Sequence, residues 1–282
     1  MTSAHAVDLS LVPTTDEKGT RVSWSDAVAA YTTALRQAGR SPGTVRLHRH
    51  YLHHTAARVR RPWSATTQQL AAALDVPHWS PETRKSARGV LVGFYRWAVL
   101  VGYVDHNPAD RLLTVTVPAG RPRPTPESVL VRALALSDDR TRLMLQLAAY
   151  EGLRCAEIAC VHTRNLVGST LYVTGKGGKT RTVPVLRDDL GYAIRRADGW
   201  LFPGRTSGHL APGTVTRLLS ETLPDGWTGH TLRHRFATRA YAGTRDLRAV
   251  GELLGHSKMD TTVRYVQLPD DALRAAVAAA AA

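Results

Sequence analysis

The sequence predicts a mainly α-helical protein with one small β-sheet or hairpin in its second half. Apolar residues recur at helical spacing through most of the chain, beginning with a run from Trp24 to Leu35. Short β-like runs appear only between residues 166 and 185. A proline-rich basic stretch, Pro118–Pro126, separates the helical segments into two groups. A chain of 282 residues has room for two domains on this plan.

The first domain is expected over residues 23–116 and contains only helices. Ser23, Ser41 and Ser80 each precede a helical pattern, as N-cap residues do. A shorter helix is expected over Thr67–Leu74, and the last helix runs to Leu100. Residues 1–22 carry no apolar pattern and are expected to be a flexible polar tail. They also lack the basic start and apolar segment of a signal peptide.

The second domain is expected over residues 127–270, after a linker at 117–126. Residues 271–282 are almost all alanine, and they suggest either a helix that docks on a neighbouring subunit or a degradation tag. The expected helices cover about Glu127–Leu136, Asp138–Tyr150, Arg154–Val161, Asp188–Ala197, Pro212–Thr222, Thr231–Tyr241 and Asp246–Leu254. The expected strands cover Leu166–Val167, Leu171–Val173 and Arg181–Val185.

The net charge of the chain indicates a polyanionic partner. The formal charge is +14 and the sequence pI is about 10.4. Residues 24–116 hold 12 Arg and Lys against 5 Asp and Glu, and residues 127–270 hold 20 against 14. This much positive charge favours nucleic acid or an acidic membrane surface as the partner. Its presence in both domains suggests a partner that is gripped from both sides.

Cysteine and apolar content place the chain in a reducing cytoplasm. Cys155 and Cys160 match neither a disulfide framework nor a zinc spacing. No apolar run approaches the roughly 18 residues of a membrane span. His50 and His54 are spaced like a metal pair, but no cysteine or carboxylate lies near them, so no metal site is expected.

The glycine-rich stretch Thr174–Lys179 is expected to be the tip of a hairpin. Three glycines allow its backbone to approach another molecule closely, and its two lysines indicate that this molecule is anionic. The stretch lacks the spacing of a nucleotide phosphate-binding loop.

Near the carboxyl end, the stretch LGHSKMDTTVRY brings an imidazole and a phenol together. Gly255 is expected to close one helix, and Asp260 and Thr261 to start a short one with Tyr265 at its far end. Either His256 is a helix cap and Tyr265 a half-buried aromatic residue, or Tyr265 is a nucleophile and His256 stabilises the group it attacks.

Residues upstream supply the other parts of a phosphoryl-transfer site. Arginine side chains hold phosphate oxygens with a planar fork. A histidine adds a donor or a base, and a lysine on a hairpin can protonate the leaving oxygen. Each candidate also has an interpretation without a catalytic role, such as an ion pair of Arg154 with Glu157. The candidate set is Arg154, Lys176, His230, Arg233, His256 and Tyr265.

These motifs resemble the tyrosine recombinases, also called the phage integrase family. The resemblance covers about Trp24 to Gln267, and it is carried by EGLRCAEIACV, TGKGGKTRTVPV, HTLRHRFAT and LGHSKMDTTVRY. It implies that Arg154 and Arg233 bind the phosphate, Lys176 is the hairpin general acid and Tyr265 is the nucleophile. His230 and His256 match the two further histidine positions. Glu157 matches an acidic residue that supports the site.

The resemblance also implies an architecture and a reaction. A helical, SAM-like core-binding domain and an α+β catalytic domain would clamp double-stranded DNA core sites. Tyr265 would form a 3′-phosphotyrosine without any cofactor or metal, in a homotetramer on paired sites, with an accessory directionality protein as a further partner. Only about 22 residues precede the first helix, so the compact type without an arm-binding domain is expected. The DNA-binding candidates are Arg46, Arg49, Arg84, Lys85, Arg88, Lys179 and Arg181.

The biological task stays open at this point. Phage integration and excision is the leading interpretation, and Xer-like dimer resolution is the alternative. Two further hypotheses are compatible with the same residues. One is a type IB topoisomerase, and the other is a DNA-binding accessory protein whose site is inactive.

Overall fold

The chain forms two compact units that meet in sequence between Pro118 and Ala119. The structure, a computed structural model, describes residues 23–118, 120–205, 207–256, 259–267 and 277. The side chains of Lys176, Met259 and Asp260 are also outside the description. The expected tail at 1–22 and nearly all of the alanine-rich end at 271–282 lie outside the described residues.

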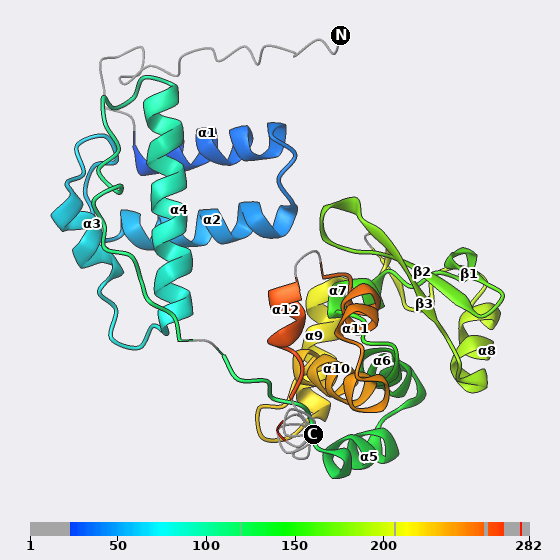
Figure 1. Cartoon of the computed structure of the whole chain (residues 1–282). Coiled ribbons are helices and arrows are strands. Elements are labelled where there is room, and N and C mark those ends of the chain that lie inside the picture. Colours follow the sequence, from blue (N-terminus) through cyan, green and yellow to red (C-terminus); the bar gives the residue numbers. More distant parts are fainter. Residues whose placement is uncertain (1–22, 119, 206, 257–258, 268–276, 278–282) are drawn as a thin grey trace, which may run out of the picture. The chain divides into compact units, whose positions relative to one another are not determined.

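Unit 1 is built from four helices in its described part (Figure 1). They are α1 (Trp24–Gln37), α2 (Pro42–Ala56), α3 (Thr67–Leu74) and α4 (Pro81–Leu100). The N-caps Ser23, Ser41, Thr66 and Ser80 each accept a hydrogen bond from the backbone N–H three residues on. Helices α1 and α2 lie side by side and α4 crosses them.

An aromatic core around Phe94 holds unit 1 together. Phe94 is fully buried, and the ring of Trp24 stacks on it at 5.6 Å between centroids. The ring of Trp63 stacks on it at 5.7 Å. Polar atoms of this core are paired with backbone, since Trp24 Nε1 donates to the carbonyl of Val59 and the Tyr95 hydroxyl to that of Pro62. This core explains why the apolar residues of α1 and α4 recur at helical spacing.

Unit 2 is built mainly from helices packed around α6. The helices are α5 (Glu127–Leu136), α6 (Asp139–Tyr150), α7 (Cys155–Ala159), α8 (Asp188–Arg196), α9 (Pro212–Thr222), α10 (Gly229–Thr244), α11 (Leu247–Leu254) and α12 (Met259–Val263). Helix α6 contacts α5, α7, α8, α9 and α10. Its residues Met144, Leu145 and Leu147 are fully buried in the main core of the unit.

A three-stranded antiparallel sheet stands beside these helices, in the order β1 (Leu166–Val167), β2 (Thr170–Thr174) and β3 (Thr180–Pro184) (Figure 1). Leu171 pairs with Val183, and Val173 pairs with Arg181. At the tip, η2 (Lys176–Gly178) turns the chain, and Gly177 has φ of +78°. The expected glycine-rich hairpin is therefore present between β2 and β3.

Three parts of unit 2 differ from the sequence predictions. Helix α7 ends at Ala159 instead of Val161, because the backbone N–H groups of Cys160 and Val161 donate to carbonyls three residues back instead of four. Helix α10 begins at Gly229, so His230 lies in its first turn. A small hairpin was missed, with β4 (Pro203–Gly204) and β5 (Gly208–His209).

The second half of the expected linker is bound to unit 2. Thr125 is buried, and its backbone N–H donates to the carbonyl of Thr231 at 3.1 Å. The guanidinium of Arg123 lies 4.2 Å from the ring centroid of Trp227 and donates to the carbonyl of Asp225. Within the expected linker, the chain is therefore attached to unit 2 from Arg123 onward.

Within the described residues, no helix combines the length and the apolar character that crossing a membrane requires.

Gly152 is predicted to be required for the stability of unit 2. Its φ is +64°, and an added Cβ would lie 2.5 Å from Cδ1 of Phe236. Gly152→Ala combines a left-handed conformation with overpacking, so we expect a loss of roughly 2–5 kcal/mol of unfolding free energy. Urea unfolding measures it. Gly213→Ala is the control, since that glycine has open space around it. Equal stability of the two variants would contradict the assignment.

Candidate active site

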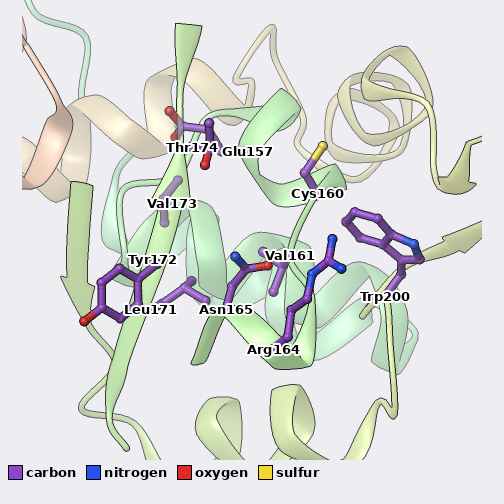
Figure 2. A pocket seen from close by; sticks show the side chains of 10 residues that line it. All are labelled: Glu157, Cys160, Val161, Arg164, Asn165, Leu171, Tyr172, Val173, Thr174 and Trp200. Atoms are coloured by element: carbon purple, nitrogen blue, oxygen red, sulfur yellow. The ribbon is translucent and has the colours of Figure 1, made fainter. Parts of the chain in front are cut away.

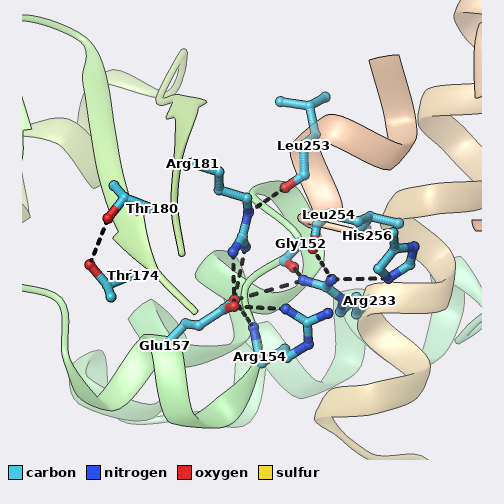
Figure 3. A network of polar contacts seen from close by, with 10 residues as sticks. All are labelled: Gly152, Arg154, Glu157, Thr174, Thr180, Arg181, Arg233, Leu253, Leu254 and His256. Carbon is cyan, nitrogen blue, oxygen red and sulfur yellow. Dashed lines mark hydrogen bonds and ion pairs between the residues drawn. The ribbon is translucent and has the colours of Figure 1, made fainter. Parts of the chain in front are cut away.

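Glu157 is the centre of a network of positive side chains (Figure 3). It lies on α7 and is 5% exposed. Its carboxylate accepts from the backbone N–H of Arg154 at 2.8 Å and from Arg154 Nη1 at 2.8 Å. Burial alone would raise the pKa of Glu157, but hydrogen bonds from Arg181 and Arg154, with the charges of Arg181 and Arg233, lower it to about 2. Glu157 is therefore a carboxylate at every working pH.

Arg233 reaches this network from α10 and is almost fully enclosed. Its guanidinium donates to the carbonyls of Gly152 and Leu254, and Nη1 lies 3.7 Å from a carboxylate oxygen of Glu157. Burial and the nearby charge of Arg154 lower the pKa of Arg233 to about 9, which leaves it protonated at neutral pH. Its Nε is buried without a partner among the described residues. The side chain is fixed by backbone carbonyls and retains an unused donor.

His256 follows the end of α11, where Gly255 has φ of +65° and forms the left-handed cap that the sequence predicts. Its Nε2 lies 3.4 Å from Nη2 of Arg233, and its Nδ1 lies 3.1 Å from the hydroxyl of Thr262, which is fully buried. Burial, followed by the charges of Arg233 and Arg154, lowers the pKa of His256 to about 4. The imidazole is thus neutral at pH 7.

Tyr265 lies just past α12 with its ring among three imidazoles. The centroid distances are 5.2 Å to His230, 4.4 Å to His234 and 4.7 Å to His256. The guanidinium carbon of Arg233 lies 5.8 Å from the ring centroid. The phenol therefore sits beside the arginine network of its own chain, which is the convergence that a nucleophile requires.

His230 lies in the first turn of α10, one turn from His234. Burial, followed by the charges of Arg233 and Arg154, lowers its pKa. A neutral imidazole at neutral pH retains a lone pair that can accept a proton. His230 is therefore placed beside Tyr265 in the protonation state that a general base needs.

The hairpin side of the site is lined by Lys179, Thr180 and Arg181. These residues, with Arg154 and His256, surround a pocket of about 430 Å³. The backbone of Lys176 lies at the hairpin tip, but its side chain is outside the described residues, so its role stays a prediction. Of the six principal candidates, the structure brings Arg154, His230, Arg233, His256 and Tyr265 together.

Three of the DNA-binding candidates are engaged inside the protein. Arg181 has a side chain only 10% exposed and pairs with Glu157. Arg84 donates to the carbonyl of Val76, and Arg88 donates to that of Leu112. By contrast, the remaining candidates, Arg46, Arg49, Lys85 and Lys179, are exposed.

The roles of Arg181 and His234 have signals in the sequence. Arg181, Val183 and Val185 alternate along one strand, and alternate residues share one face, so Arg181 faces the buried side. His234 follows His230 at a spacing of four, which places both imidazoles on one face of α10. The ring of His234 stacks on the ring of Tyr265 at 4.4 Å between centroids, so His234 packs directly against the phenol.

A second pocket, of about 190 Å³, is lined by Glu157 and by residues of β2 (Figure 2). Arg164, Asn165 and Trp200 line its opposite wall. Apart from Glu157, it contains none of the predicted active-site residues. No cluster of three or more His, Cys, Asp or Glu suited to a metal ion occurs within the described part of the chain.

The stability of the folded chain should fall as pH falls through the range in which His234 titrates. Burial, followed by the charge of His230, lowers the pKa of His234 from 6.5 to about 4. Between these values the unfolded chain binds the proton and the folded chain does not, so the unfolding free energy decreases as pH decreases.

His234→Gln should therefore show a shallower slope of unfolding free energy against pH in this window. Urea titrations from about pH 4 to about pH 7 measure the slope. Glu151 titrates near 7 because burial raises its pKa, against the charge of Arg187, but it is present in both proteins and cancels. Identical slopes would contradict the assignment.

Comparison with known proteins gives the family. The phage integrase family matches residues 125–271. The tyrosine recombinase XerC of Rhodospirillum centenum is 36% identical over 212 residues, which cover 64% of this chain and 61% of that protein. XerC of Pelobacter propionicus is 31% identical over 270 residues, 83% of this chain and 87% of that protein.

Among solved structures, lambda integrase (75–356), as a dimer bound to a COC′ core site, has a TM-score of 0.71. The two share 20% identity, over 86% of this chain and 95% of that chain. This likeness shows the fold, and it confirms the mainly helical architecture with a small sheet. The family match confirms the resemblance drawn from the sequence motifs. The chain belongs to the phage integrase family of tyrosine recombinases, the enzymes that break and rejoin DNA at specific sites.

Proposed function

We propose that this chain exchanges DNA strands by direct attack of Tyr265 on a backbone phosphate. The observation that carries the proposal is the position of the Tyr265 ring beside Arg233 and within 4.4–5.2 Å, centroid to centroid, of His230, His234 and His256. A phenol used only as a core residue has no need of so many ionisable neighbours. Tyr265 lies beside Arg233 of its own chain, so we expect the tyrosine to attack a phosphate that is bound by the same subunit.

The phosphate is held by Arg154, Arg233 and His256. Arg154 is the most accessible of the network, with 36% of its side chain exposed, and it lines the 430 Å³ pocket. Two guanidiniums balance the charge that develops on the non-bridging oxygens, and this electrostatic effect is usually the largest in phosphoryl transfer. Rigid support of Arg233 by backbone carbonyls means that little reorganisation is needed when the phosphate arrives.

The reaction requires two proton movements. The Tyr265 oxygen forms a bond to phosphorus, and the bond from phosphorus to the 5′ oxygen breaks. His230 takes the phenol proton, and Lys176 gives a proton to the departing 5′ oxygen. The product is a 3′-phosphotyrosine with a free 5′-hydroxyl. The same hydroxyl, or one from a partner duplex, reverses the step and releases Tyr265.

Two basic units grip the duplex. Exposed Arg46 and Arg49 on α2, Lys85 on α4 and Lys179 on the hairpin are the proposed phosphate contacts. The formal charge of +14 supports binding to a polyanion. Exposed arginines and lysines that have no internal partner in the described residues remain free to make these contacts.

The assembly is proposed from the neighbours in structure. Lambda integrase has been described as a tetramer bound to a Holliday junction, and XerH as a complex with a palindromic difH substrate. By analogy, this chain acts as a homotetramer on two core sites. An accessory directionality protein and a cytoplasmic location belong to the same proposal.

Phage integration and dimer resolution require the same chemistry and differ in the DNA that is paired. Integration joins two different DNA molecules, whereas dimer resolution acts on repeated sites in one molecule. The curated relatives carry Xer names, which supports the second task, so both arrangements of sites are tested. A type IB topoisomerase would relax plasmids without joint products.

Tyr265→Phe should abolish covalent attachment to DNA and leave binding in place. The substrate is a plasmid carrying the DNA that flanks the gene, and a detergent-resistant protein–DNA adduct and recombinant products are measured. Tyr192→Phe is the control, since Tyr192 lies exposed on α8. An adduct formed by Tyr265→Phe would contradict the proposal, and relaxation without recombinants by the unmodified chain would favour the topoisomerase.

The double variant Arg46→Gln/Arg49→Gln should weaken DNA binding at every sequence. The logarithm of the DNA association constant falls linearly with the logarithm of the salt concentration, by about 0.9 per phosphate contact. The steepness of this dependence should therefore decrease by roughly 2 in the double variant. Fluorescence anisotropy over a salt series measures it. Arg84→Gln is the control, because that guanidinium donates to a backbone carbonyl and its loss should leave the slope unchanged. An unchanged slope in the double variant would remove α2 from the DNA interface.

A further inference from the structure

Arg181 and Arg154 share one carboxylate in a way that fills it (Figure 3). Arg181 Nη1 and Nη2 donate to the two oxygens of Glu157, each at 2.8 Å. Arg154 supplies its backbone N–H and Nη1 to the same two oxygens. A carboxylate has about four lone-pair positions, so these four hydrogen bonds saturate it. Arg233 remains outside, with its Nη1 at 3.7 Å.

The three guanidiniums around Glu157 differ in how far their side chains are buried. The exposed fraction is 36% for Arg154, 10% for Arg181 and 1% for Arg233. Arg181 is turned inward from β3 and uses both Nη atoms on Glu157. Arg154 and Arg181 both line the pocket, and Arg154 is the more exposed of the two. A bidentate arginine–carboxylate pair is the strongest hydrogen-bonded ion pair available, so Arg181 is the main partner of Glu157.

Arg181 also fixes the end of the helix that delivers His256. Its Nε donates to the carbonyl of Leu253 at 2.6 Å, next to the Leu254 carbonyl that Arg233 binds. Gly255 packs closely on the Arg181 side chain, since an added Cβ there would lie 3.0 Å from Cδ. One side chain thus connects the strand after the hairpin, the carboxylate on α7 and the last turn of α11.

Loss of Arg181 would change the balance of charge in the site. Two acceptor positions on Glu157 would open, and the nearest donors are Arg154 and Arg233, the residues proposed to bind phosphate. A buried carboxylate left without its main partner is costly and draws on other cations. Glu157 would then compete with the DNA phosphate for those guanidiniums.

We propose that Arg181 is a positioning residue for strand cleavage: by occupying Glu157 and the end of α11, it keeps Arg154 and Arg233 available for the scissile phosphate. This inference rests on the proposed function, because it assigns Arg181 a role in the same reaction. Arg181 touches neither the phosphate nor Tyr265 in this role. Its effect passes through Glu157, so removal of Glu157 should relieve the effect of removing Arg181.

The test is a double-mutant cycle on cleavage. The substrate is a short duplex that contains the cleavage site, which is located by mapping the adduct formed on the DNA flanking the gene. The rate of adduct formation is measured at saturating concentrations of this duplex, and the affinity for the duplex is measured separately. Arg181→Met keeps the volume and removes the donors, and we expect the rate to fall by at least about tenfold, as for other misplaced catalytic groups, with affinity changed less than about threefold. Arg181→Met/Glu157→Gln should recover a substantial part of the lost rate.

A role in folding alone predicts the opposite result for the double variant. Arg181→Met/Glu157→Gln would then form the adduct as slowly as Arg181→Met or more slowly, and that outcome overturns the proposal. A DNA contact predicts lost affinity with an unchanged rate at saturation, which also overturns it. The matched control is the exposed pair Arg248–Glu252 on α11, whose equivalent single and double variants should leave the rate unchanged.

Lysine provides a second route if Arg181→Met does not fold. Arg181→Lys fills one acceptor of Glu157 instead of two, so its rate should lie below that of the unmodified chain, and Arg181→Lys/Glu157→Gln should be faster than Arg181→Lys. No recovery in that pair overturns the proposal. Failure of the proposed function is distinguishable, since the unmodified chain would then form no adduct at Tyr265.

Discussion

A single buried carboxylate organises the catalytic unit. Glu157 collects Arg154, Arg181 and Arg233 from three separate elements, and without it three positive charges would repel one another in a poorly solvated space. The network carries more positive than negative charge, which leaves a deficit that an incoming phosphate can neutralise. Stability and binding are thus coupled, because the same charges that strain the empty site attract the DNA backbone.

The polar groups around this carboxylate are fixed mostly by backbone atoms. Arg233 binds the carbonyl of Gly152, which only a left-handed residue places there, and the carbonyl of Leu254 at the end of α11. His256 is tied through Thr262 to the segment that carries Tyr265. Helix ends and tight turns therefore set the site, and the helices of the core hold these ends in register.

The sequence predicted the helices and most of the site because these follow local rules. Caps, helical periodicity and the hairpin glycines are read within a few residues, and the motif spacing identifies Arg154, His230 and Arg233. What it could not show is which arginines turn inward. Arg84, Arg88 and Arg181 look like surface charges in sequence, yet each donates to an acceptor within the protein. Arg84 binds the carbonyl of Val76, eight residues away, whereas Arg88 and Arg181 bind Leu112 and Glu157, each 24 residues away. The anchoring of Arg123 on Trp227 is likewise a long-range contact.

The central claim is that the phenol of Tyr265 becomes covalently joined to a cut DNA strand. The most direct measurement is mass spectrometry of the adduct after digestion of the DNA by nuclease and of the protein by protease. The account predicts a nucleotide attached through a 3′ phosphate to the peptide that contains Tyr265, on the tyrosine itself. Attachment to another residue, or a stable adduct through a 5′ phosphate, would contradict it.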